Sequence, residues 1–128
     1  MLKNNEAFPS FSIDDLAAAR RFYGETLGVE VGDVPGMGEL LELRLHGGLR
    51  VMLYHKPNHA PATFTVLNFI VENVEQTVDE LTRRGVKFEI YTDGPVRTNE
   101  KGISSGPGPK MAWFTDPAGN ILSVLETT

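Results

Sequence analysis

Two stretches of the chain share one pattern, in which alternating apolar and polar residues lead into a helical spacing. Residues 8–16 match residues 66–74 position by position, with Phe11 matching Phe69 and Ile13 matching Val71. Alternation with a period of two is typical of a half-buried strand. Since the same pattern occurs twice at a constant offset, we interpret the chain as two copies of one structural unit.

Each of these strands leads into a predicted helix with a recognisable start and end. Asp15 and Asn73 occupy matching positions and suit a helix N-cap, and Gln76 follows Asn73 at the spacing of a capping box. Both helices are predicted to end at a glycine followed by a valine, at residues 28–29 and 85–86. The offset between the copies changes by one residue there, which indicates a single-residue insertion or deletion inside the helix or at its exit.

Three further strands are predicted in each copy, the last two as a hairpin. The tight hairpin turns are His46-Gly47-Gly48 and Asp116-Pro117-Ala118-Gly119. The predicted order is therefore β-α-β-β-β twice, in a single α+β domain that covers residues 1–128. The first module spans about residues 7–56, the linker 57–63 and the second module 64–126; the further strands are expected at residues 29–31, 40–45, 49–55, 86–91, 110–115 and 120–126.

A long connection, residues 93–109, precedes the second hairpin and is rich in glycine and proline. A loop of this length without secondary structure of its own is usually functional or mobile. It could be a lid over a pocket, because binding residues concentrate on such loops, or a merely tolerated insertion. Both interpretations stay open at this point.

The alternation also gives each strand one face that packs on the helices and one opposite face. The opposite face carries apolar side chains with a few neutral hydrogen-bonding groups, which is the composition of a small-molecule pocket. The same composition would fit additional core or a dimer interface. Trp113 and Tyr54 are candidate stacking surfaces, although Trp113 would equally fit the core. The predicted ligand pocket consists of Phe8, Ser10, Ser12, Met52, Tyr54, Val66, Asn68, Ile70, Trp113, Ile121, Ser123 and Leu125.

Composition and charge restrict the classes of partner. The chain has 128 residues, 41% of them hydrophobic, which is enough for a packed core without cross-links. It has no cysteine, which excludes disulfides, thiolate zinc sites and a cysteine nucleophile. The net charge of -5 argues against a nucleic-acid partner and mildly favours a neutral or cationic ligand. No apolar run resembles a membrane span or a signal peptide, so we expect a cytoplasmic protein without a membrane partner.

Two motifs resemble those of a known family. They are Asp15-Leu16 followed by Phe22-Tyr23 and Leu27-Gly28, and then Asp116-Pro117-Ala118-Gly119-Asn120 before the last strand. With this spacing the chain is similar, over roughly residues 8–126, to the vicinal-oxygen-chelate superfamily. That superfamily contains glyoxalase I, extradiol dioxygenases, fosfomycin-inactivating thiol transferases and bleomycin-resistance proteins. The resemblance implies paired modules that each form half of an incompletely closed barrel, and a homodimer, but no particular activity.

In the metal-dependent members of this family, four side chains hold a divalent ion, one each from the first, fourth, fifth and eighth strands. These ligands are typically His, Glu or Gln, His and Glu. Carried over to this chain, the four positions are Phe8, Met52, Val66 and Ser123, and none of them is a competent ligand. The resemblance therefore implies a protein without a metal ion, and no cofactor is expected.

The remaining polar candidates are few. His46, His55 and His59 are expected on loops and strand ends that do not converge on one point. Glu42 and Arg44 share a face, where they could form an ion pair or offer a polar handle to a ligand. The sequence contains no recognisable serine–histidine–aspartate arrangement, phosphate-binding glycine loop or paired-carboxylate motif.

Three functions from different classes fit these observations. The favoured one is a metal-free protein of the bleomycin-resistance type that binds or sequesters a small cationic or aromatic molecule. The alternatives are a metal-dependent lyase, isomerase or dioxygenase of the same superfamily, and a regulatory or interaction module on the same fold. Analysis of bound metal separates the first two.

Overall fold

The computed structural model describes residues 1–127, which form two compact units. The first unit covers residues 1–60 and the second begins at Pro61, inside the segment predicted as the linker. Each unit combines helix with one small sheet, so the predicted α+β class is confirmed. Within the described residues, no helix has both the length and the apolar composition that crossing a bilayer requires.

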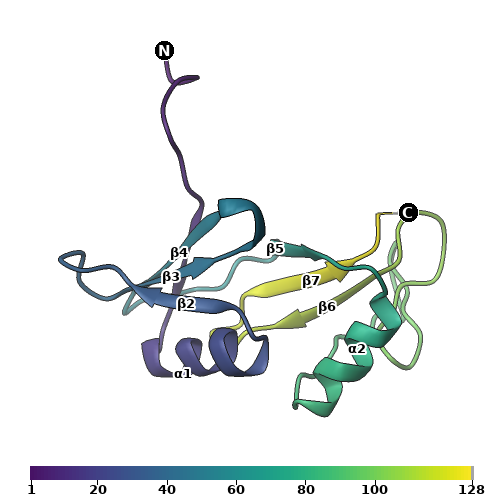
Figure 1. Cartoon of the computed structure of the whole chain (residues 1–128). Coiled ribbons are helices and arrows are strands. Elements are labelled where there is room, and N and C mark those ends of the chain that lie inside the picture. Colours follow the sequence, from purple (N-terminus) through teal and green to yellow (C-terminus); the bar gives the residue numbers. More distant parts are fainter. Residues whose placement is uncertain (128) are drawn as a thin grey trace. The chain divides into compact units, whose positions relative to one another are not determined.

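The first unit is a four-stranded sheet with a helix beside it (Figure 1). The strands lie in the order β1-β4-β3-β2, with β1 and β4 parallel and the other neighbours antiparallel. In chain order the elements are β1 (Ser10–Ile13), α1 (Leu16–Arg20), the π-helical η1 (Arg21–Thr26), β2 (Glu30–Asp33), β3 (Leu40–Arg44), the 3-10 turn η2 (His46–Gly48) and β4 (Arg50–His55).

The second unit repeats the order of strands and helix with one strand missing. Its sheet has the order β5-β7-β6, with β5 parallel to β7, and α2 contacts β6 and β7. The elements are β5 (Thr65–Ile70), α2 (Val74–Arg83), β6 (Met111–Thr115) and β7 (Ile121–Leu125). The strand predicted at residues 86–91 is wrong as a continuous strand, because this segment pairs with β6 only through an isolated bridge from Phe88 to Phe114.

Strand β4 shows the predicted alternation of packed and open positions. Val51 and Leu53 are at most 1% exposed, whereas Met52 and Tyr54 are partly exposed on the other face. Leu53 lies directly beside Leu41 of β3, which is also buried. The sheet therefore has one face inside the core and one open face, as the pattern of the sequence predicts.

The two predicted helix N-caps are confirmed. The Asp15 carboxylate accepts a hydrogen bond from the Ala18 backbone N–H at 3.0 Å, and the Asn73 side-chain oxygen accepts one from the Gln76 N–H at 2.9 Å. Each cap satisfies a backbone donor that has no partner inside its helix. The caps therefore set where both helices begin.

The one-residue difference between the copies lies in a π-helical segment. In the second copy, the Val86 N–H donates to the Leu81 carbonyl, five residues back. In the first copy, the Val29 N–H donates to the matching Tyr23 carbonyl, which is six residues back. A π-turn accommodates one extra residue in a helix without changing the face that packs. The structure therefore places the extra residue in η1, where it keeps Tyr23 fully buried.

The turn between β6 and β7 is closed by side-chain hydrogen bonds. Asp116 is 4% exposed, and its carboxylate accepts from the backbone N–H groups of Ala118 and Asn120, both at 2.9 Å. The Asn120 side-chain amide donates to the same carboxylate at 3.0 Å. Gly119 completes the turn at a φ of 85°, a region that favours glycine. The Asp-Pro-Ala-Gly-Asn motif is therefore a structural turn that joins these two strands.

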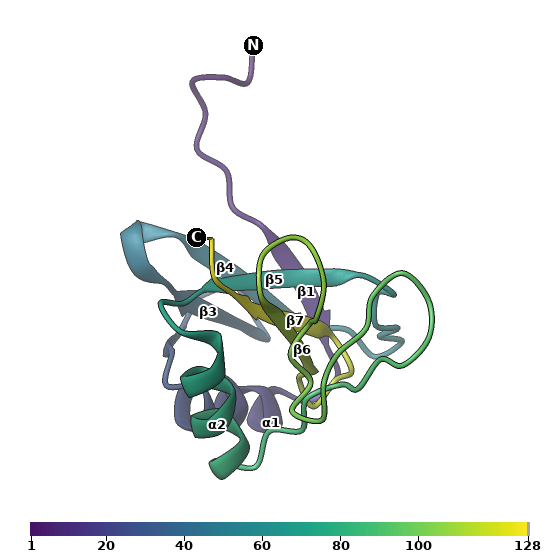
Figure 2. The ribbon, with the colours of Figure 1, turned by 90° about the vertical axis from the view of Figure 1, so that its right-hand side faces the viewer.

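The long connection from α2 to β6 is fixed near its middle and forms two loops (Figure 2). Ile103 is 5% exposed and bridges to Ala112 of β6, and Thr98 bridges to Ser104. Lys101 forms ion pairs with Glu75 and Asp79 on α2, which raise the pKa of its amine. The connection is thus partly paired with the sheet, unlike the structureless loop expected from its glycines and prolines.

Candidate functional site

The open face of the second sheet carries a row of three predicted pocket residues. Ser123 lies on β7 between Asn68 of β5 and Trp113 of β6. Ser123 is fully buried, and its hydroxyl donates to the Asn68 side-chain oxygen at 2.5 Å. This hydrogen bond orients the amide of Asn68, so a neutral polar pair lies next to Trp113 in the sheet.

Strand β5 departs from regular alternation at its start. Thr65 pairs with Ile121 and Leu67 with Leu122, so Val66 is an extra residue in a β-bulge between them. A bulge re-aims the side chains next to it, because two residues oppose one on the neighbouring strand. The position assigned to Val66 by alternation is therefore shared with Thr65, which lies beside the open-face residue Ile121.

Three adjoining cavities follow β6 and the connection that precedes it, with volumes of about 300, 250 and 660 Å³. Trp113 lines the first and second, and Ser104, Gly106 and Pro109 line the second and third. Neighbouring cavities share lining residues, and we call the three together the groove, which lies within the second unit. The connection from α2 supplies one wall of this groove, and β6 and β7 supply the other.

The first of these cavities is aromatic, and we call it the aromatic cavity. The ring centroids of Tyr91 and Trp113 lie 5.7 Å apart, and the ring planes form an angle of 74°, which is an edge-on geometry. Burial, followed by the negative charge of Glu89, raises the pKa of the Tyr91 phenol, so Tyr91 stays neutral at physiological pH. The residues that line the aromatic cavity are Thr63, Phe64, Thr65, Tyr91, Asp93, Pro95, Val96, Trp113 and Ile121.

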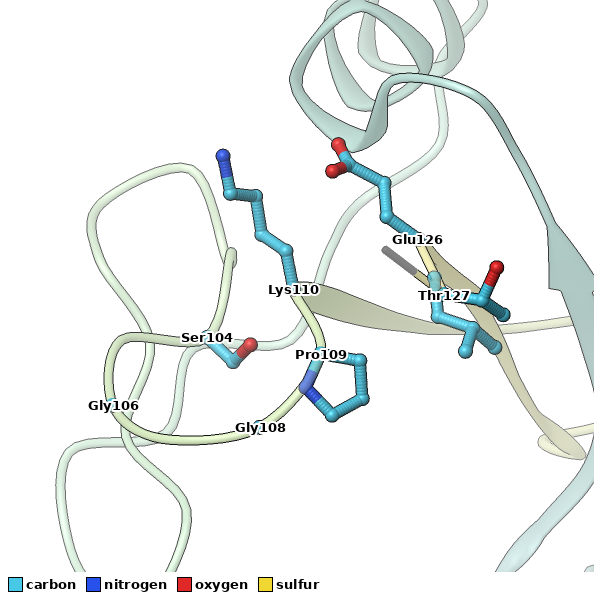
Figure 3. Close-up of a pocket in the computed structure, with 8 residues that line it drawn as sticks. Ser104, Gly106, Gly108, Pro109, Lys110, Glu126 and Thr127 are labelled. Carbon is cyan, nitrogen blue, oxygen red and sulfur yellow. The ribbon is translucent and has the colours of Figure 1, made fainter.

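The largest of these three cavities has a different character (Figure 3). The side chains of Lys110 and Glu126 extend to the same side of it, and glycine and proline form much of the remaining wall. The Glu126 carboxylate accepts a hydrogen bond at 2.7 Å from the backbone N–H of Val74, the first residue of α2. Its charge is therefore engaged with a helix N-terminus. This part of the groove lacks aromatic lining, so the aromatic cavity is the stronger candidate for an organic ligand.

The open face of the first sheet gathers the other predicted pocket residues on strands. Ser10 pairs with Met52, and Ser12 with Tyr54. The Ser12 hydroxyl shares a hydrogen bond with Nδ1 of His59 at 2.6 Å. Phe8 precedes β1 and is 59% exposed. This face is thus a mixture of small hydroxyls, a thioether and an aromatic ring.

A charged network crosses the same face next to Met52. Glu42 accepts hydrogen bonds from Arg44 at 2.8 Å and Arg50 at 2.5 Å, and Arg44 also pairs with Glu30 at 2.9 Å. The hydrogen bond from Arg44 contributes most to holding the pKa of the Glu42 carboxyl below its usual range. A side chain at Gly32 would require the Arg44 guanidinium to shift. The predicted ion pair of Glu42 and Arg44 is confirmed.

The lowered pKa of Glu42 gives a testable pH dependence. Its stabilising contribution is present above the unfolded-state pKa of 4.5 and is lost as the pH falls through the lower folded-state pKa. Glu42→Gln should therefore lower the melting temperature near neutral pH, and the difference from the wild type should shrink in acid. Thermal unfolding of both proteins across that range measures it. The matched change at exposed Glu6, Glu6→Gln, should show no such trend, and a Glu42→Gln difference that grows in acid would contradict the assignment.

The four family ligand positions have no shared metal-binding geometry among the described residues. Within residues 1–127, no group of three or more His, Asp or Glu side chains is placed to hold a metal ion. Met52 offers a soft thioether, the Ser123 hydroxyl is committed to Asn68, and Phe8 and Val66 have no lone pair to donate. The side chains present at these positions therefore do not fit the ion that the family's metal-dependent members hold.

The predicted pocket residues separate into two groups, one in each unit. Ser10, Ser12, Met52 and Tyr54 lie on the first sheet; Asn68, Ile70, Trp113, Ile121, Ser123 and Leu125 lie on the second. Trp113 and Ile121 line the aromatic cavity, and Leu125 lines the largest one. Sequence reasoning missed Phe64, Tyr91 and Asp93, which lie outside the named strands. For Tyr91 and Asp93, the available signal was the long connection from α2 to β6, on which both lie.

Comparison with known proteins agrees with this architecture. A crystal structure of TnmS3, an antibiotic binding protein from Streptomyces sp. CB03234, is 27% identical over 98% of both chains, with a TM-score of 0.70. A glyoxalase/bleomycin resistance protein from the same organism is 28% identical over 93% of this chain and 99% of its own, with a TM-score of 0.63. A glyoxalase/dioxygenase from Nostoc punctiforme, 16% identical over 99% and 94% of the two chains with a TM-score of 0.69, shares the fold.

No curated protein matches the chain. The family match is nevertheless extensive, since it spans residues 9–124 and includes both N-caps, the π-helical segment and the Asp116 turn. With the confirmed α+β class, this match places the chain in the Glyoxalase/Bleomycin resistance protein/Dioxygenase superfamily.

Proposed function

We propose that this chain is a metal-free binding protein that sequesters a small organic molecule in the groove along β6. The observation that carries the proposal is the aromatic cavity, where Trp113 and Tyr91 offer ring surfaces beside the apolar Ile121 and Val96. Burial of an aromatic or aliphatic body against such rings stabilises a complex through the hydrophobic effect and ring contacts. The few polar groups nearby would fix the orientation of the ligand.

The chemistry at the family's ligand positions supports binding without metal-dependent catalysis. Activation of a substrate oxygen by a divalent ion needs several nitrogen or oxygen ligands held around one open position. Phe8, Met52, Val66 and Ser123 do not provide that set. A relative at 27% identity is described as an antibiotic binding protein, which supports a natural product or drug-like molecule as the ligand here.

The proposal includes a homodimer in the cytoplasm. Phe8, Phe64 and Ile70 are each more than half exposed on or next to the edge strands β1 and β5. Large apolar side chains at sheet edges favour association, and a symmetric pair closes such a surface. Sedimentation velocity at micromolar concentration should give a dimer, and a single monomeric species would contradict this part of the proposal.

Metal analysis and a binding screen test the proposed function together. The purified protein should contain no stoichiometric Fe, Mn, Ni or Zn, and a small-molecule library should include compounds that raise its melting temperature. A ligand at about a hundred times its Kd stabilises by about 2.7 kcal/mol. One tightly bound transition metal per chain, whose removal abolishes ligand binding, would overturn the proposal.

Adjacent substitutions assign the binding site. Tyr91→Ala should weaken any compound found in the screen by roughly tenfold, because one ring of the aromatic cavity is lost. Ile90→Ala, one residue earlier, removes a side chain that is half exposed and does not line the cavity. The affinity of this variant for the same compound should therefore be unchanged. Equal effects of the two changes would place the ligand elsewhere.

A further inference from the structure

We propose that the aromatic cavity receives an organic ammonium group of the ligand, held by Asp93 and the rings of Tyr91 and Trp113. This inference rests on the proposed function, and it adds the chemical class of the bound group. It follows from the charge and the composition of the cavity wall, which differ from those of the rest of the groove.

Asp93 gives the aromatic cavity a negative charge. Of the nine residues that line it, Asp93 is the only one that carries a charge. Among the described residues, its carboxylate has no hydrogen-bond or ion-pair partner, unlike Glu126 at the other end of the groove. Arg97, the nearest cation along the connection, lines the neighbouring cavity of about 250 Å³ and not the aromatic cavity. The lining therefore presents one uncompensated negative charge.

The aromatic rings of the cavity also favour a cationic group. The face of an aromatic ring is electron-rich, and Trp attracts a cation most strongly, at distances up to about 6 Å from the ring centre. Trp113, Tyr91 and Phe64 all line this cavity. Tyr91 remains a neutral phenol because burial and Glu89 raise its pKa, so its ring does not compete with Asp93 for charge. Three rings and one carboxylate are the combination that recognises alkylated ammonium groups.

Other chemical groups fit less well. A purely apolar group would take water away from the Asp93 carboxylate without giving it a partner, which is unfavourable. An anionic group would be repelled by Asp93 and by the net charge of -5. A metal ion would find a single carboxylate, since the remaining lining offers no nitrogen or acidic ligand. An alkylammonium group meets both the charge and the apolar surface of the cavity.

The test uses a cation and its uncharged analogue of the same shape. Choline and 3,3-dimethyl-1-butanol differ in replacing the quaternary nitrogen by carbon, so their binding compares charge at nearly constant volume. Trp113 is the only tryptophan of the chain, and its fluorescence therefore reports directly on the aromatic cavity. Choline should bind at least about fivefold more tightly than the butanol.

Two aspartate variants localise the preference. Asp93→Asn should abolish the difference between the two probes. Asp14→Asn removes the same charge from an exposed position in the first unit and should keep the difference intact. Circular dichroism should show that both variants fold, because each changes an exposed side chain. Tyr91→Leu provides a second variant, which should weaken choline more than the butanol.

The outcomes separate this inference from the proposed function. If both probes bind equally, or if Asp93→Asn keeps the preference, the ammonium site is wrong while the groove still binds organic molecules. If neither probe binds but a neutral compound from the library quenches Trp113, the inference is likewise overturned and the proposed function stands. If no library compound binds at all, both fall.

Discussion

Replacing Leu53 by aspartate is expected to leave the chain unfolded, whereas Met52→Asp, one residue earlier on β4, should give a folded protein. Leu53 is fully buried on the face of β4 that lies in the core, and Met52 is partly exposed on the open face. The two positions are adjacent in sequence but point to opposite faces of the strand. The pair therefore tests the assignment of faces on which the site depends.

The two variants should differ strongly in their free energy of unfolding. Removing the Leu53 side chain alone costs about 3 kcal/mol, and an unpaired carboxylate in the core adds several more. A domain of this size is stable by about 5 to 15 kcal/mol, so the sum approaches or exceeds the whole. Met52→Asp places a carboxylate next to Glu42, whose charge is already paired with Arg44 and Arg50, and should cost about 1 kcal/mol.

Circular dichroism and thermal unfolding of the two variants measure this contrast. Leu53→Ala serves as an intermediate control, since it removes volume without adding charge, and it should fold with a lowered melting temperature. A folded Leu53→Asp together with an unfolded Met52→Asp would mean that the faces of β4 are reversed. The pocket positions on β1 and β4 would then be wrong as well.

These faces could be predicted because burial on one side of a sheet forces a period of two in the sequence. Ile13, Val51 and Leu53 carry that period in the first unit, and Asp15 and Asn73 carry the helix starts. Each of these features is local, so its signal lies within a few residues of chain. The repeat added independent support, because it gave matching positions in both copies.

Features that depend on contacts distant in the sequence were less predictable. The segment at residues 86–91 has an apolar, strand-like composition, yet it meets β6 only at Phe88 and Glu89 because the following residues turn away into the long connection. The partial ordering of that connection depends on Lys101 reaching Glu75 and Asp79 on α2. No pattern within the connection itself encodes those partners.

The candidate site shows the same division. Ile121 was predicted because it alternates on its strand, and Trp113 was predicted as a candidate stacking surface. Asp93 and Tyr91 were not, because their place in the cavity wall comes from the path by which the connection returns to the sheet. The bulge at Val66 likewise depends on pairing with β7, and alternation alone gives no sign of it.

The second large effect is expected at the turn between β6 and β7. Asp116→Ala should lower the free energy of unfolding by about 3 kcal/mol, since three hydrogen bonds to a nearly buried carboxylate are lost and their donors stay buried. For a chain of this size, that corresponds to roughly 10 °C in melting temperature. The turn joins the strands that carry Trp113 and Ile121, so ligand binding should weaken together with stability.

Asp116→Asn separates the contributions within the turn. Its amide oxygen can still accept from the backbone N–H groups of Ala118 and Asn120, but its NH₂ group faces the Asn120 amide that donated to the carboxylate. The loss should therefore be about half that of Asp116→Ala, or roughly 1.5 kcal/mol. Asp14→Ala, at an exposed site, should change the stability by less than about 0.5 kcal/mol. Urea unfolding of the three variants measures this order, and an Asp116→Ala protein as stable as Asp14→Ala would show that the turn closes without its carboxylate.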